Sequence, residues 1–184
     1  EFSLFANSKT DDHSSLSFSG ILGETNGFYT LRENQRGSVD RKANSEVSSF
    51  SIGYDFEVED LWRIEVNANR FDEDRVNGTP LAVNGTEATD ISASALRVFD
   101  DGSSGLKMIV YHQDREFQNQ ITAVTDDRNS ERPALHQFDV PASANGASLR
   151  YFTRIEDTHD FSIGADFRVA DGSVAEQFRN LGAG

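Results

Sequence analysis

The feature that most constrains the fold is a strict alternation of apolar and polar residues in residues 61–71. The segment alternates Trp62, Ile64, Val66 and Ala68 with Arg63, Glu65, Asn67 and Asn69. Because successive side chains of a strand point to opposite faces, one face of this strand is apolar and the other carries charges and amides. Residues 49–56 and 161–169 repeat the alternation. These segments predict strands that separate two different solvents.

Composition excludes several classes of protein. The chain has 184 residues, of which 36% are hydrophobic, and a net charge of −14. A large acidic excess argues against a nucleic-acid partner, because binding of phosphates requires a basic surface. Cysteine is absent, which removes disulfides and thiolate metal sites. No apolar run reaches the roughly 20 residues of a transmembrane helix, whereas a membrane-spanning strand needs only about 9–11.

Alternation and turn-forming residues predict an all-β fold, an antiparallel up-and-down meander of about eight strands. We expect these strands at residues 2–7, 16–23, 46–56, 61–71, 90–99, 105–117, 147–155 and 159–170. Tight connections at 57–60, 100–104 and 156–158 alternate with long polar ones at 30–45, 72–89 and 118–146. In a meander every second connection lies at the same end, so all long loops fall on one side, as in outer-membrane barrels.

Two strands fit this pattern less well. In residues 90–99, Arg97 shares a face with Ile91, Ala93 and Ala95. A β-bulge or a patch covered by protein would explain the placement. In residues 105–111, apolar side chains fall on both faces.

Three segments together resemble the barrel of a TonB-dependent outer-membrane receptor: residues 27–41 (GFYTLRENQRGSVDR), 71–81 (FDEDRVNGTPL) and 130–149 (SERPALHQFDVPASANGASL). Their order and spacing are similar to the early part of that barrel, and the similarity covers most of residues 27–169. Such receptors have 22 strands around an N-terminal plug, and the plug carries the box that binds TonB.

The resemblance implies that residues 1–184 are a single region, a partial transmembrane β-barrel without the plug. We therefore expect a fragment of a larger receptor in the cell outer membrane, in contact with outer-membrane lipid. TonB would act only through the missing plug. The implied function is import of a scarce solute such as an iron chelate, another metal chelate, cobalamin or an oligosaccharide.

Charged residues at strand ends and on polar faces are the candidate ligand contacts. Dense carboxylates bind Ca²⁺ or attract cations, and arginines inside a barrel contact anionic solutes. Pairing with carboxylates on neighbouring strands, or simple solvation of an acidic loop, is the alternative interpretation. On external loops and the lumen face, the predicted ligand-binding residues are Asp72, Glu73, Asp74, Arg75, Arg63, Arg70, Arg115 and Arg128.

Three other interpretations remain open. Eight strands are also the minimum for a small self-closing barrel. A soluble or cell-surface all-β module would use the same alternation to bury a core. An enzyme has the least support, because no catalytic motif is recognised and the four histidines (His13, His112, His136 and His159) lack the spacing of a metal site. We predict no enzyme activity, no cofactor and no bound metal.

Overall fold

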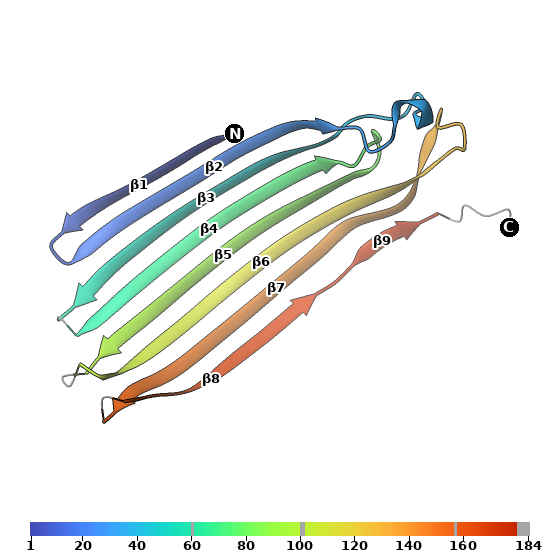
Figure 1. Ribbon diagram of the computed structural model, residues 1–184. Helices are drawn as coiled ribbons and strands as arrows, with labels where there is room; N and C mark the ends of the chain where they lie inside the picture. The colour runs from blue at the N-terminus through green and yellow to red at the C-terminus, as the bar shows by residue number, and fades with distance from the viewer. Residues whose placement is uncertain (60, 100–101, 157, 180–184) are drawn as a thin grey trace.

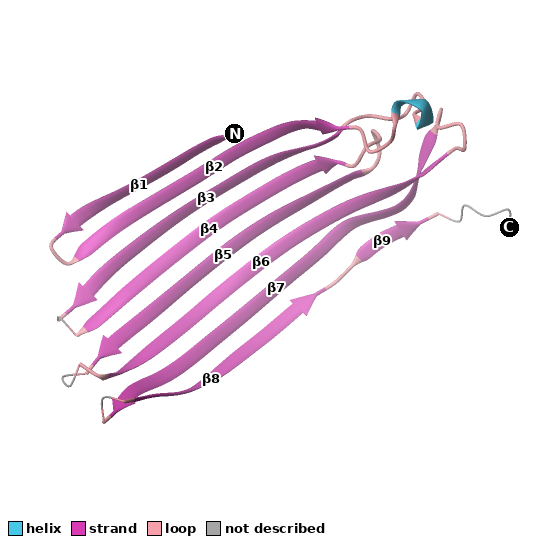
Figure 2. Ribbon diagram, in the orientation of Figure 1, coloured by secondary structure: helices cyan, strands magenta, loops and turns pink. Residues whose placement is uncertain are grey.

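The computed structural model describes residues 1–59, 61–99, 102–156 and 158–179. In these residues the chain is all-β, with nine antiparallel strands in one sheet (Figures 1 and 2). The described part contains one short 3-10 turn, η1 (Glu33–Gln35), and no α-helix. The strands are β1 (Phe2–Asp11), β2 (Ser14–Phe28), β3 (Ala43–Val58), β4 (Trp62–Val76), β5 (Val83–Val98), β6 (Ser104–Val124), β7 (Glu131–Ile155), β8 (His159–Gly172) and β9 (Ala175–Phe178).

The predicted meander is confirmed in strand order, since β1 to β8 pair consecutively. Each predicted strand lies within one of these eight, apart from a residue or two at its ends. The short β9 was not predicted. It follows β8 and pairs with residues 135–139 of β7, beyond the part of β7 that pairs with β8. Residues 60, 100–101 and 157, which belong to three predicted tight turns, lie outside the described residues.

Two of the three predicted long loops are wrong. Residues 72–89 and 118–146 consist mostly of strand, and their connections are confined to residues 77–82 and 125–130. The connection between β2 and β3, at residues 29–42, is long as predicted. The missed strand segments mix polar and apolar side chains on both faces, so no regular alternation marks them in the sequence.

The register brings the apolar residues of neighbouring strands together on one face. One row across the sheet consists of Leu16, Tyr54, Val66, Ala93, Val110, Ala147 and Phe167, and we call its face the apolar face. The adjacent row lies on the opposite face, which we call the polar face. It consists of Ser17, Gly53, Asn67, Ser92, Tyr111, Gly146 and Arg168.

The sheet is a single layer. Elements of the described chain contact only the strands to which they are hydrogen-bonded, so nothing packs across either face. The only buried hydrophobic residues in the described chain are Ala88 and Ala144. A soluble sandwich requires a second layer over the apolar face, and these residues supply none.

The sheet is also open. The outer edges of β1 and β8 have no partner strand among the described residues, and Figure 1 shows them on opposite sides of the sheet. A small self-closing barrel requires β1 to pair with β8, and the described strands do not pair in this way.

Gly27 is required where β2 bends toward the loop that leads to β3. The register slips between Thr25 and Phe28, which is a β-bulge. Gly27 has a φ of 58°, and a Cβ there would lie 1.3 Å from the carbonyl oxygen of Ala43. Only glycine permits both the left-handed backbone and this approach of β3.

Substituting Gly27 should therefore destabilise the sheet. Gly102 is a matched control, because it has a φ of 67° but nothing within 4 Å of the Cβ position. Gly102→Ala should cost only the left-handed strain, about 1–2 kcal/mol. Gly27→Ala should cost clearly more, because the clash adds to that strain. The unfolding midpoint in denaturant measures both, and equal losses would contradict this account of the bulge.

Candidate functional site

The apolar face is exposed over most of its area. Val110, Ile163 and Phe167 expose 54%, 60% and 65% of their surface, respectively. Single exposed apolar side chains are common, but a contiguous apolar band across the strands of a sheet is a candidate interaction surface. The band, rather than a cleft, is therefore the main candidate site.

From β2 to β6 the boundary of this band runs obliquely across the strands. At the end of the sheet that carries the long connection, which we call the loop end, the last apolar residue of β2 on this face is Leu22. The row of Leu22 reaches β6 at Glu116, whereas the continuous apolar run of β6 on this face ends at Val110. The strands in between follow the same trend. Their continuous apolar runs on this face end at Phe50 in β3, Ala68 in β4 and Ile91 in β5, whereas Val76 and Val83 form a separate apolar pair nearer the loop end.

The slope of that boundary gives a strand tilt. The distance along β6 from Glu116 to Val110 is about 20 Å at roughly 3.3 Å per residue. The distance across the strands from β2 to β6, four inter-strand steps of about 4.8 Å, is about 19 Å. The strands therefore make an angle of roughly 45° with the normal to the boundary. At the opposite end, the turn end, the boundary shifts in the same sense: Ser14 of β2 shares a row with Met108, and β6 remains apolar to Leu106. In Figure 1, the ends of the strands at the turn end are offset from one pair of neighbouring strands to the next.

The polar face is lined mainly by small hydroxyl and amide side chains at its centre. Asn69 Nδ2 donates to Ser51 Oγ at 2.7 Å and to the carbonyl of Phe50 at 3.2 Å. Two of its arginines pair with carboxylates across strands. Arg63 contacts Asp55 at 3.4 Å, and Arg115 donates to both carboxylate oxygens of Asp90 at 2.8 and 3.0 Å. Arg63 and Arg115 thus lie on the predicted face, but each is paired with a carboxylate.

Arg70 lies on the other face, in contrast to its predicted lumen position. It shares the apolar face with Ala68, just beyond the boundary of the band. Its guanidinium pairs with Glu87 and donates to Thr89 Oγ1 at 3.0 Å. The even spacing from Trp62 to Arg70 already placed both residues on one face.

The predicted acidic loop is part of β4. Asp72 and Asp74 lie on the apolar-face side above the band, whereas Glu73 and Arg75 lie on the polar side and pair with each other at 2.7 Å. The strand therefore separates these four residues instead of gathering them at one ligand site. Within the described chain, no group of three His, Cys, Asp or Glu side chains is arranged to hold a metal ion.

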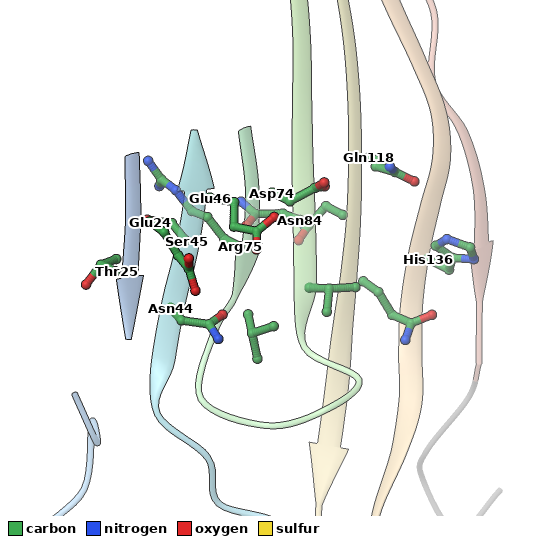
Figure 3. A pocket seen from close by; sticks show the side chains of 14 residues that line it. Glu24, Thr25, Asn44, Ser45, Glu46, Asp74, Arg75, Asn84, Gln118 and His136 are labelled. Carbon is green, nitrogen blue, oxygen red and sulfur yellow. The ribbon is translucent and has the colours of Figure 1, made fainter. Parts of the chain in front are cut away.

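A hollow of about 390 Å³ lies near the loop end (Figure 3). Asp74 and Arg75 are among its lining residues, which come from β2 to β7. The lining is mainly carboxylate and amide, with His136 on its far side. The labelled lining residues are Glu24, Thr25, Asn44, Ser45, Glu46, Asp74, Arg75, Asn84, Gln118 and His136.

Arg128, the last predicted ligand contact, instead joins two connections at the loop end. Its guanidinium donates to Asp40 at 2.6 to 3.1 Å through three hydrogen bonds, and only 4% of the Asp40 side chain is exposed. The amide of Val39 donates to the carbonyl of Arg128 at 3.2 Å. A Cβ on Gly37 would lie 2.2 Å from that same carbonyl oxygen. We call this contact between residues 37–40 and 128 the loop latch.

The third connection joins the latched loops. The amide of Arg41 donates to the carbonyl of Gly78 at 2.8 Å. The amide of Leu81 donates to Glu131 Oε1 at 3.0 Å, and Gln120 Nε2 donates to the carbonyl of Leu81 at 2.8 Å. All three connections of the loop end therefore form one bonded cluster. The sequence does not predict Asp40 as a site residue, because no local pattern links it to Arg128.

Neither the scan of protein-family models nor the search of curated proteins found a match to this chain. The described residues also contain no helix with the length and apolarity needed to cross a membrane.

The loop latch makes a pH-dependent prediction. The Arg128 hydrogen bonds, together with the amide of Gly37, lower the pKa of Asp40 from 3.8 to about 2. Because the folded pKa is lowered, the carboxylate stabilises the latch above pH 3.8, and this stabilisation is lost as the pH falls toward 2. Hydrogen exchange at the Val39 amide, corrected for intrinsic rates, should accelerate over this window.

Asp40→Asn should remove that pH dependence and weaken the latch at neutral pH by on the order of 2 kcal/mol, because Arg128 loses its charged acceptor. Glu33→Gln is the control, since Glu33 is an exposed acid in the same loop. An unchanged Val39 exchange profile in Asp40→Asn would rule out the latch.

Proposed function

We propose that this chain forms part of the membrane-spanning wall of an outer-membrane transport barrel. The observation that supports this proposal is the oblique apolar band on a sheet that has no second layer among the described residues. The roughly 45° tilt agrees with the strand tilt of membrane barrels, which is about 35–45°. The surface of a bilayer is flat, so it crosses tilted strands along an oblique line. The apolar segment of each strand then ends at one depth in the bilayer rather than in one row of the sheet.

The height of the band agrees with the same proposal. On β8 it extends from Phe161 to Val169. That segment is about 26 Å long at 3.3 Å per residue, and a tilt of roughly 45° leaves a height of about 19 Å. Outer-membrane barrels have an apolar band about 25 Å tall. The polar face then borders the water-filled interior.

The resemblance in residues 27–41, 71–81 and 130–149 supports a more specific proposal, the barrel of a TonB-dependent receptor that imports a scarce solute. The bonded cluster of connections at the loop end fits the external side of such a wall, because outer-membrane barrels carry their longer loops there. Arg63 and Arg115 of the polar face give no support to an anionic solute over a neutral one, because each of them is paired with a carboxylate, Asp55 and Asp90 respectively.

Adjacent residues on opposite faces test the proposal. Val66 lies in the middle of the apolar band, and Asn67 lies next to it on the polar face. Val66→Asp should reduce assembly into membranes, at a cost on the order of 2 kcal/mol, because a carboxylate would face hydrocarbon. Asn67→Asp adds the same charge on the water side and should assemble normally.

The fraction of protein retained in urea-washed membranes measures assembly. Equal retention of the two variants at the wild-type level would mean that the apolar face does not contact lipid. Purification of the folded chain as a monomer without detergent would contradict the proposal independently.

A further inference from the structure

Arg97 is the one cation within the apolar band of the described strands. Its row contains Trp62 on β4 and Leu106 on β6, and neither pairing has a register shift near it. The bulge that would have turned Arg97 away is therefore absent from β5. On the proposed function, this guanidinium faces the membrane.

Aromatic rings surround the guanidinium. Its Cζ lies 5.7 Å from the ring centroid of Trp62 and 5.6 Å from that of Phe99. Phe99 in turn lies 6.5 Å from Tyr151, centroid to centroid. Contacts with ring faces stabilise a cation at the edge of an apolar surface but supply no hydrogen-bond acceptor in the plane of the guanidinium. We call Arg97, Trp62, Phe99 and Tyr151 the arginine–aromatic cluster.

The hydrogen bonding of Arg97 is incomplete. Its Nε atom is buried and has no hydrogen-bond partner among the described residues. The described chain also provides no carboxylate within ion-pair distance of Arg97, whereas Arg63, Arg70 and Arg115 each have one. A buried donor and a charge that both lack a partner indicate a missing anionic acceptor.

The position of the cluster limits what that acceptor can be. Arg97 lies at the turn-end boundary of the band, near the end of β5. In a bilayer this is the level of the lipid headgroups, where Trp and Tyr concentrate. A phosphate there offers charged oxygens to the planar fork of the guanidinium, while acyl chains cover the adjacent apolar rows.

We propose that the arginine–aromatic cluster binds the phosphate of an anionic phospholipid in the leaflet at the turn end. This inference rests on the proposed function, because the lipid reaches Arg97 only if the apolar face lies in the membrane. The bound headgroup completes the hydrogen bonding of Arg97 and fixes the depth of β4 to β7 in the bilayer.

Trp62 is the only tryptophan of the chain, which provides a local probe. The protein is reconstituted in mixed vesicles of phosphatidylcholine and phosphatidylglycerol, in which one lipid at a time carries brominated acyl chains that quench tryptophan. Brominated phosphatidylglycerol should quench Trp62 with a relative association constant about fivefold above that of phosphatidylcholine, the factor expected for one arginine at an anionic surface.

Arg97→Gln should abolish this preference, and Arg97→Lys should keep part of it. Arg154→Gln is the matched control. Arg154 lies at the same end of the sheet on the polar face, where it pairs with Asp160 at 2.9 Å, and its loss should leave the preference intact.

The possible failures are distinguishable. If neither brominated lipid quenches Trp62, the apolar face is outside the bilayer, and both the proposed function and this inference are wrong. If both lipids quench equally in the wild-type protein, or Arg97→Gln keeps the preference, only the inference is wrong. Loss of the preference on addition of inorganic phosphate would identify a free-phosphate site and overturn the lipid assignment.

Discussion

A single layer of strands has no interior, and this constraint governs the whole molecule. The ladder hydrogen bonds satisfy the backbone within the sheet, but they cannot remove large apolar side chains from the surface. Residues such as Ile163 and Phe167 therefore stay exposed on the described sheet. On the proposed function, hydrophobic stabilisation comes from the surrounding membrane rather than from a core, because no second layer lies over the described strands.

The same constraint explains which parts of the fold could be predicted from the sequence. Alternation of apolar and polar residues reflects a difference between the two faces of a strand. The sequence therefore predicts β4 from Trp62 to Ala68, where the two faces differ. From Asp72 to Arg75 both faces are polar, and this continuation of the same strand read as a loop. The extension of β6 beyond Phe117 also has no regular alternation, because polar and apolar side chains are mixed on both of its faces. Only the pairing with neighbouring strands defines these segments, and pairing depends on distant residues.

The candidate site shows a similar division. Strand parity alone assigns Arg63 to the polar face, and the same parity should have assigned Arg70 to the apolar one. Parity does not identify the partner of an arginine; that requires the strand register. The register places Asp90 opposite Gln113 and within reach of Arg115. The contact between Asp40 and Arg128 joins residues 88 positions apart and follows from the meeting of two loops, so no local pattern contained it. For Arg97, parity predicts the apolar face, and the structure confirms it. The β-bulge that was expected to explain this placement is absent.

The open edges of β1 and β8 set the next requirement for the proposed function. Hydrocarbon cannot satisfy the unpaired N–H and C=O groups along these edges, so a membrane wall of this kind needs further strands on both sides. A strand that pairs with the outer edge of β8 in the same meander is antiparallel to it and continues the apolar band across the join. Because the boundary is a plane and the strands keep a common tilt, the apolar residues of each added strand are fixed in register by those of its neighbour. On the proposed function, the apolar band therefore constrains the strands that would complete the wall as well as the strands described.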